Sequence, residues 1–323
     1  MASDNHHGIF GMNASKCTLA PLFFVLAACS PACTPNEAIA PAPVSAAEAV
    51  PPKDGSGAAD SGAADPATPI IEEAKGIDLT KLTDPQKTSF FQIINTEPSA
   101  CGKPHSLAVS LRDDDSCRDS LSVSQFVADA LASGASPSDI KGALGEVVDS
   151  LRVREIDITG RPVYGNERAP VTVVVFADFE CPHCAAEAPA LKQTIDQFRG
   201  RAKLVFKHFP LGGHVRARPA AEATMAAFSQ GKFWEMAELC FGHQTALEDD
   251  DLRAYARRLG LDLAKFEADL KSGAGAKIVD ADRADGEKLE ITGTPAVFIN
   301  GRYHNQFLFG GSVAGWIDDA LRR

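Results

Sequence analysis

The sequence has little positive charge and few cysteines for its length. Its 323 residues include 32 Lys and Arg against 43 Asp and Glu, which gives a net charge of −11 and an isoelectric point near 5.2. A nucleic-acid partner requires a basic surface that binds phosphates, so this charge balance argues against one. Eight cysteines are too few for a scaffold held together by disulfides. The composition is otherwise globular, with 45% hydrophobic and 23% charged residues, and the length suggests about two domains.

The apolar stretch near the N-terminus, CTLAPLFFVLAA at residues 17–28, has only twelve residues. It is too short to span a bilayer but is typical of the apolar region of a signal peptide. The tetrapeptide Leu-Ala-Ala-Cys at 26–29 resembles the bacterial lipobox, in which the cysteine becomes the lipidated first residue of the mature chain. We therefore expect a signal peptide at 1–28 and a lipid anchor on Cys29, on the periplasmic or cell-envelope side of a bacterial membrane. An ordinary secretory signal is the alternative, and it also places the protein outside the cytoplasm.

Composition divides the rest of the chain into three parts. More than half of residues 34–75 are Ala, Pro, Gly or Ser, so we expect a disordered tether over 29–76, with a random-coil span of roughly 40 Å. Apolar side chains at helical spacing predict a small all-α module over 77–154. Its expected helices lie at about 84–94, 122–132 and 137–151. A catalytic domain is expected over 155–323.

The helical module contains Cys101 and Cys117, sixteen residues apart in a polar stretch with three consecutive aspartates at 113–115. In an oxidising compartment, this arrangement favours a structural disulfide that closes the loop between the two cysteines. An accessory redox-active pair is the alternative hypothesis for the same two residues.

The chain is organised around residues 171–184, VTVVVFADFECPHC. Its first seven residues predict a strand buried on both faces, because a strand exposed on one face would alternate with polar residues. The segment that follows has apolar residues at helical spacing as far as Phe198, which predicts a helix. Cys181 and Cys184 therefore lie where a strand passes into a helix.

This position makes Cys181 a candidate reagent. Free N–H groups and the positive end of the helix dipole stabilise negative charge on its sulfur, and the thiolate is the reactive form. We expect Cys181 to be the exposed, acidic thiol and Cys184 to be the shielded thiol that resolves a mixed disulfide. Pro182 suits a first helical turn, and His183 adds a cationic or hydrogen-bonding partner that favours the thiolate. Stabilising the reduced form makes the disulfide an oxidant.

A Cys-x-x-Cys pair has two other common uses, as a structural disulfide and as half of a zinc site. The sequence has no second Cys-x-x-Cys, and His208 and His214 do not show the regular spacing of a closed zinc site. Redox chemistry is therefore the favoured interpretation. Cys240 lies on an apolar helical face and is expected to be a buried, inert thiol.

The remaining pattern of the catalytic domain also alternates strands and helices. The expected strands lie at about 161–164, 171–177 and 203–210. A helical insertion over 214–273 and a charged helix at about 276–290 follow. Asn300 and Gly301 then predict a turn between a strand opened by Pro295 and a partner strand at 303–309, before a final helix.

Together these motifs closely resemble the DsbA family of thioredoxin-like thiol–disulfide oxidoreductases, in the branch with a helical insertion. The resemblance covers residues 158–323 and rests on FECPHC at 179–184, KHFPL at 207–211, QGKFW at 230–234, GTP at 293–295 and FING at 298–301. It implies an α/β, thioredoxin-like fold. It also implies a cis bond before Pro295, which lies against the Cys-x-x-Cys, and a Thr294 backbone that pairs with an extended client segment.

The same resemblance implies that the protein introduces disulfides into client proteins outside the cytoplasm. A client thiolate attacks Cys181, Cys184 leaves, and a second client thiol resolves the mixed disulfide. A membrane redox partner would recycle the pair, without a cofactor or metal. A thiol reductase or disulfide isomerase for a restricted client, such as apocytochrome c, is one alternative. A membrane-tethered metal-binding or scaffold protein with Cys181, His183 and Cys184 as ligands is another, although it has no need of the Thr294-Pro295 element.

Overall fold

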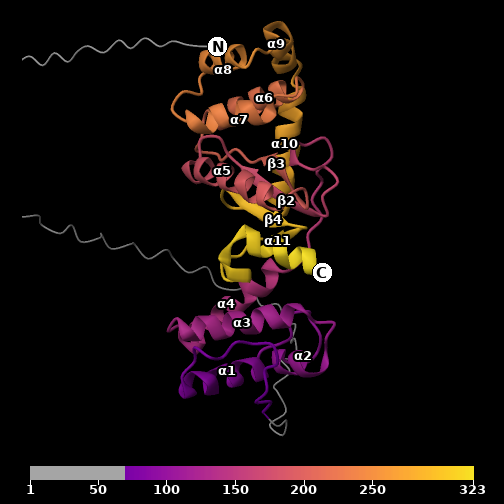
Figure 1. The fold of residues 1–323 in the computed structure, drawn as a ribbon. Coiled ribbons are helices and arrows are strands. Elements are labelled where there is room, and N and C mark those ends of the chain that lie inside the picture. Colours follow the sequence, from indigo (N-terminus) through magenta and orange to yellow (C-terminus); the bar gives the residue numbers. More distant parts are fainter. Residues whose placement is uncertain (1–69) are drawn as a thin grey trace, which may run out of the picture. The chain divides into compact units, whose positions relative to one another are not determined.

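The computed structural model describes residues 70–323, and Figure 1 shows their ribbon. The expected signal peptide at 1–28 and the expected lipidated Cys29 lie outside the described residues. The same holds for nearly all of the expected tether, of which only residues 70–76 are described. No helix in the described part of the chain is both long and apolar enough to cross a membrane.

Helices alone make up the first part of the described chain. They are α1 (Asp84–Thr96), α2 (Leu107–Asp113), α3 (Asp119–Ala132) and α4 (Pro137–Ser150). Capping explains where three of them begin. Thr83 forms a capping box with Gln86 at the start of α1, and the hydroxyls of Ser106 and Ser136 each accept a backbone N–H at the starts of α2 and α4. The sequence does not predict α2, because its seven residues are too few to show a helical period.

The second part is built on a mixed sheet of five strands in the order β1-β3-β2-β4-β5. The strands are β1 (Val163–Gly165), β2 (Val171–Ala177), β3 (Ala202–His208), β4 (Ala296–Ile299) and β5 (Arg302–Tyr303). The central strand β2 is parallel to β3 and antiparallel to β4, with Ala177 opposite His208 and Phe176 opposite Ala296. This register brings the end of β2, which leads into the Cys-x-x-Cys, to the same end of the sheet as the residues before β4.

Several helices accompany the sheet (Figure 1). They are α5 (Pro182–Gln197), α6 (Ala217–Phe228), α7 (Phe233–Gly242), α8 (Asp249–Arg258), α9 (Leu263–Ser272), α10 (Ala274–Lys288) and α11 (Val313–Arg322). The helices α6 to α9 occupy the segment in which the sequence predicts an insertion. The apolar pattern does not separate α9 from its neighbours, because only Phe266 of that helix is buried.

The central strand is buried on both faces, as its sequence predicts. Val175 belongs to a core that also contains residues of α5 and α11, whereas Phe176 belongs to a smaller core with Phe209. Helix α10 covers the smaller core at close range. A Cβ atom on Gly286 of α10 would lie only 2.5 Å from ring atoms of Phe209, so a residue without a side chain is required there.

The strand β5 is shorter than the partner strand expected at 303–309, so that prediction is wrong. The chain leaves the sheet after Tyr303 because Asn305 forms a turn. The Asn305 side chain accepts the N–H of Phe307 at 2.8 Å, and its carbonyl accepts the indole N–H of Trp316 at 3.2 Å. The following residues form the 3₁₀ helix η1 (Phe309–Gly311) instead of a strand.

Charged side chains join the helical part to the sheet. Arg302 of β5 is 7% exposed and donates from Nε to the carbonyl of Leu151, the residue after α4, at 2.9 Å. Its Nη atoms pair with Asp119 of α3 at 2.5 Å and Asp319 of α11 at 3.3 Å. Arg323 pairs with the same two carboxylates, each at 2.6 Å. These contacts hold the end of α4 against β5.

Candidate active site

Cys181 is the N-cap residue of α5, and Pro182 takes the first helical position. Proline is compatible with that position, because its φ is helical and an N–H there would have no partner within the helix. The thiol of Cys181 donates to the carbonyl oxygen of Thr294 at 3.2 Å, and the peptide bond between Thr294 and Pro295 is cis. The sheet register thus brings together two segments that are 113 residues apart in the sequence.

Both cysteines of the motif are buried thiols, with 5% of Cys181 and 1% of Cys184 exposed. The expectation that Cys181 is exposed is therefore wrong, because the loop that carries Thr294 packs against its sulfur. Burial raises the pKa of the Cys184 thiol to about 12. The backbone N–H of Asp178 donates to the Cys184 sulfur at 3.5 Å, whereas no carboxylate or imidazole of the described residues is hydrogen-bonded to it.

Pro182 and His183 are both exposed on the first turn of α5. In the described part of the chain, His183 forms no hydrogen bond with Cys181 or with any other residue. The proposed effect of His183 on the thiolate therefore stays a prediction. Without a direct contact, such an effect is limited to a charge interaction through solvent, which salt screens.

Two polar side chains hold the loop that leads into α5. The amide nitrogen of Gln244 donates to the carbonyls of Phe179 and Cys181, at 2.8 and 2.9 Å. A carboxylate oxygen of Glu180 accepts two backbone N–H groups at the start of α6, at 2.6 and 2.7 Å. Glu180 stands next to the motif in the sequence, whereas Gln244 lies in the insertion without any pattern around it. Sequence reasoning therefore missed Gln244.

Asp178 follows β2 and is a third support of this loop. Its role was not predicted from the sequence. Its side chain is fully buried, and it accepts the backbone N–H groups of Glu180 and Leu211, each at 2.7 Å. Nδ1 of His214 lies 2.8 Å from the same carboxylate. Asp178 therefore fixes both the turn before Cys181 and the chain that follows β3.

His208 is buried at the end of β3, and neither of its ring nitrogens has a hydrogen-bond partner within residues 70–323. The rings of Phe179, Phe206 and Phe233 lie 6.0, 5.2 and 6.0 Å from the imidazole, centroid to centroid. Burial among these rings lowers the pKa of His208 to about 3. The imidazole is therefore uncharged at neutral pH, next to the strand that leads to the cysteines.

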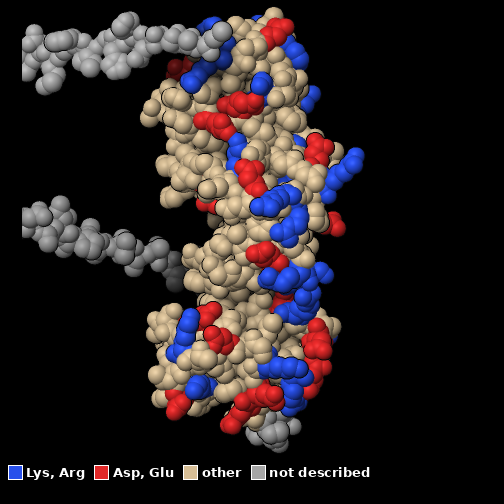
Figure 2. All heavy atoms as spheres, viewed as in Figure 1, with Lys and Arg blue, Asp and Glu red and all other residues tan. Residues whose placement is uncertain are grey.

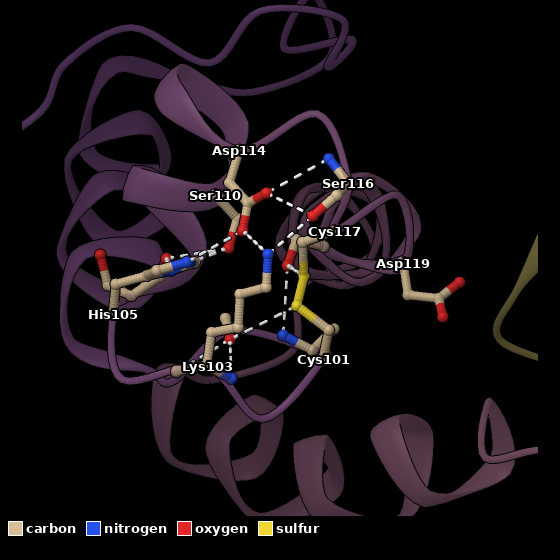
Figure 3. The surroundings of a disulfide bond; sticks show 12 residues. Cys101, Lys103, His105, Ser110, Asp114, Ser116, Cys117 and Asp119 are labelled. Carbon is tan, nitrogen blue, oxygen red and sulfur yellow. Dashed lines mark hydrogen bonds and ion pairs between the residues drawn. A yellow bond between two sulfur atoms is a disulfide. The ribbon is translucent and has the colours of Figure 1, made fainter.

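The second cysteine pair, Cys101 and Cys117, forms a disulfide with a Cα–Cα distance of 5.8 Å. Figure 3 shows Lys103, His105, Asp114 and Ser116 turned toward one another beside it, whereas Asp119 points away. Nζ of Lys103 lies 2.6 Å from both Asp114 and Ser116, and Nε2 of His105 lies 3.1 Å from Asp114. The Lys103 ammonium and the Ser116 hydroxyl hold the pKa of the Asp114 carboxyl well below its usual value.

No metal centre is apparent in the described chain. Between residues 70 and 323, no three His, Cys, Asp or Glu side chains are grouped so that they could hold a metal ion. Cys181 and Cys184 are buried, whereas His183 between them is exposed. Cys240 is buried in α7, as expected, and burial raises the pKa of its thiol to about 12.

The surface beside α5 carries little charge. Figure 2 shows few charged side chains along the edge near α5 and α7, whereas Lys, Arg, Asp and Glu gather along the opposite edge. A groove of about 520 Å³ lies between the two helices and includes Ala185, Trp234 and Phe241. Lys192 and Glu238, which also line it, form an ion pair with each other. The groove therefore presents mainly apolar atoms, and its lining includes Ala185, the residue that follows Cys184.

Residues 158–319 match the model of a protein family described as thioredoxin. The chain belongs to the thioredoxin family. The expected α/β, thioredoxin-like fold is confirmed. The matched segment is half of the chain and contains the sheet, the insertion and the Cys-x-x-Cys, whereas helices α1 to α4 precede it.

Curated relatives include two sodium/proton antiporters. The antiporter NhaA 3 of Salinispora tropica is 44% identical over 146 residues, which are 44% of this chain and 22% of the antiporter. NhaA 1 of Salinispora arenicola is 42% identical over 144 residues, with the same shares of the two chains. The chain spans about a fifth of the length of these relatives. Their names describe the transport activity of those antiporters.

Solved structures similar to this chain include three thiol–disulfide proteins. A thioredoxin-like oxidoreductase from Silicibacter pomeroyi is 26% identical with a TM-score of 0.45, over 54% of this chain and 95% of that one. The thiol–disulfide exchange protein alpha-DsbA2 from Wolbachia pipientis is 22% identical with a TM-score of 0.45, over 56% and 94%. Oxidised BdbD from Bacillus subtilis is 24% identical with a TM-score of 0.45, over 53% and 98%.

Proposed function

We propose that this protein is an extracytoplasmic oxidase that introduces disulfides into client proteins through Cys181 and Cys184. Family membership supports thiol–disulfide exchange in general, and the proposal adds a direction and a compartment. The observation that carries the direction is the contrast between the two sulfurs. Cys181 caps the N-terminus of α5 and contacts the Thr294 loop, whereas Cys184 is buried with a pKa of about 12.

The reaction begins with the Cys181–Cys184 disulfide. A client thiolate attacks the Cys181 sulfur, the new client–Cys181 bond forms, and Cys184 leaves with the electron pair and takes up a proton. A second client thiolate then attacks the client sulfur of this mixed disulfide. Cys181 leaves as a thiolate, which the free N–H groups at the start of α5 stabilise. The client loses two electrons and two protons, and the cysteine pair ends reduced.

Burial of Cys184 favours this direction. With a pKa of about 12, Cys184 is protonated at pH 7, and no carboxylate or imidazole of the described residues is hydrogen-bonded to its sulfur. A protonated Cys184 attacks the mixed disulfide slowly, so the second client thiol has time to resolve it. A reductase requires the opposite, because Cys184 itself must then attack the mixed disulfide.

Two features of the chain support the proposed compartment. The lipobox-like sequence that ends at Cys29 would anchor the protein outside the cytoplasm. The Cys101–Cys117 disulfide supports an oxidising surrounding, because cytosolic reductants keep such thiols reduced. A membrane oxidant would then be needed to return the Cys181–Cys184 pair to its disulfide after each client.

The direction can be tested with a peptide that carries two cysteines. The oxidised protein, without added oxidant, should convert about one peptide dithiol per protein molecule to the disulfide. The Cys181→Ser variant should convert none, and it serves as the control for background air oxidation. If instead the reduced protein reduces the peptide disulfide to completion, the protein is a reductase and the proposed direction is wrong.

A further inference from the structure

A cleft of about 430 Å³ opens on the loop that contacts Cys181. Its size falls within the range of about 300–1,000 Å³ that is usual for ligand-sized pockets. The floor includes Pro295, Phe298 and Tyr303, and Tyr303 is 38% exposed. Thr294 lines the same cleft, and its carbonyl accepts the Cys181 thiol, so the cleft and the reactive sulfur share this loop.

The opposite wall of the cleft comes from outside the thioredoxin-like domain. Helix α4 contributes Glu146, Asp149 and Ser150. This wall is held in place, because buried Arg302 binds the carbonyl at the end of α4 and the backbone N–H of Arg154 donates to the carbonyl of Gly301 at 2.9 Å. The helical part of the chain therefore shapes a surface next to the catalytic loop.

The charges that line the cleft are mostly negative. They are three carboxylates, of Glu146, Asp149 and Glu290, and one guanidinium, of Arg154. Nη2 of Arg154 lies 2.5 Å from Asp149, and Nε of Arg152 lies 3.2 Å from the same carboxylate. Asp149 is thus neutralised by two arginines, which leaves no unpaired cation on the lining.

Glu146 and Glu290 both line the cleft and are exposed, and neither forms an ion pair with any residue of the described chain. One belongs to α4 and the other to the loop before the cis-proline. The nearest basic residue along the chain from Glu290 is Lys288, which pairs with Asp285 and does not line the cleft. A bound cation would therefore meet two unpaired carboxylates above an apolar floor.

We infer that this cleft selects client segments in which Lys or Arg stands close in sequence to the reactive cysteine. The inference rests on the proposed function, because it names the clients of the same site. The apolar stem of Lys or Arg would pack on Pro295 and Tyr303 while its charge faces Glu146 and Glu290. Charge complementarity of this kind sets specificity and the association rate more than raw affinity.

The test compares three peptides that carry the same two cysteines flanked by Lys, Gln or Glu, oxidised by the oxidised protein. We expect the second-order rate constant for single-turnover oxidation of the Lys peptide to exceed that for the Glu peptide roughly five- to twentyfold at low salt, with Gln between them. The double variant E146Q/E290Q should reduce that ratio to less than about twofold. Salt near 1 M should have the same effect on the wild type, since the screening length is then about 3 Å.

A matched control keeps the test specific to the cleft. Asp115 is an exposed carboxylate in the loop closed by Cys101 and Cys117, and it does not line the cleft. The D115N variant loses one negative charge elsewhere, which matches either single variant, E146Q or E290Q, and it should keep the full Lys-to-Glu ratio. A ratio that falls equally in D115N would assign the preference to the overall charge of −11 and overturn the role of the cleft.

A binding measurement separates this inference from the proposed function. Peptides with both cysteines replaced by Ser are titrated against the protein, which reports the cleft without any redox step. If no peptide is oxidised but the Lys peptide still binds several-fold more tightly in a manner that E146Q/E290Q abolishes, the oxidase proposal fails and the cleft stands. Equal binding and equal rates for the Lys and Glu peptides would overturn the inference.

Discussion

The two cysteine pairs of this protein differ in how the polar groups near them are hydrogen-bonded. Around the Cys101–Cys117 disulfide, the polar groups are paired, as His105 is with Asp114. Around the Cys-x-x-Cys, Asp178 and Gln244 are hydrogen-bonded as well, but the buried His208 has no hydrogen-bond partner in the described chain. One cysteine pair is closed as a disulfide in the helical part, and the other consists of two buried thiols at the start of α5.

The difference shows that solvation and local pairing, rather than the presence of two cysteines, decide what a pair does. In the helical part, Lys103, His105 and Asp114 are paired with one another beside the disulfide. None of these three groups is therefore left unpaired to promote thiol–disulfide exchange. In the thioredoxin-like part, burial raises the pKa of Cys184 and lowers that of His208, which keeps both groups uncharged. Only Cys181, at a helix N-terminus, lies where negative charge is stabilised.

The sharpest way to separate the two pairs is to remove the first one. Replacing Cys101 and Cys117 together with Ser should lower the free energy of unfolding by about 3 kcal/mol, because the disulfide closes a loop of 16 residues. Denaturant titration measures this loss. The rate at which a small disulfide oxidises Cys181 should change by less than about twofold, since the two sites share no contact. A loss of that rate would make Cys101–Cys117 part of the redox chemistry.

The buried His208, which has no hydrogen-bond partner in the described chain, makes the free energy of unfolding depend on pH. The pKa of His208 is about 3 in the folded protein and about 6.5 when unfolded, so the unfolded state binds more protons between these values. Stability from this group is complete above pH 6.5 and is lost as the pH falls toward 3. At pH 5 the loss is about 2 kcal/mol.

The variant His208→Phe tests that account, because its ring fits among the neighbouring phenylalanines and cannot be protonated. Denaturant titrations at pH 7 and pH 5 should show a difference smaller by about 2 kcal/mol in the variant than in the wild type. The exposed His243 offers a control, since His243→Gln should leave the pH dependence unchanged. An unaltered pH dependence in His208→Phe would mean that another group causes the loss.

The smallest expected effect belongs to His183. A cationic partner near the thiolate favours the reduced form, so His183→Ala should lower the reduction potential of the Cys181–Cys184 pair, by about 5–20 mV for an exposed side chain without direct contact. Equilibration with a glutathione buffer measures the shift. A rise in potential contradicts the expected direction. A fall of more than about 60 mV would place His183 in contact with the Cys181 sulfur in solution.

Sequence alone predicted the features that depend on a local pattern. The unbroken apolar run at 171–177 predicted both ends of β2 correctly, because a strand buried on both faces has no alternation of apolar and polar residues. The helix start at Pro182 followed from the residue types around it. The placement of Thr294 beside Cys181 came from the resemblance to a family, since no local rule joins segments so far apart.

The features that sequence missed depend on distant contacts. The burial of Cys181 results from the Thr294 loop, and the support from Gln244 comes from the insertion, so neither leaves a local signal. The turn at Asn300 and Gly301 predicted a partner strand at 303–309, but Asn305 accepts the backbone N–H of Phe307 and β5 ends early. Short helices such as α2 contain too few residues to show a period.

The reduction potential of the Cys181–Cys184 pair tests the central claim most directly. An oxidase must have a pair that is more oxidising than its clients, so equilibration with reduced and oxidised glutathione should give a value above about −200 mV. The C101S/C117S variant should give the same value within error, because only the catalytic pair exchanges. A potential near the value of about −270 mV typical of thioredoxin would mean that the pair is poised to reduce disulfides, which would contradict the account.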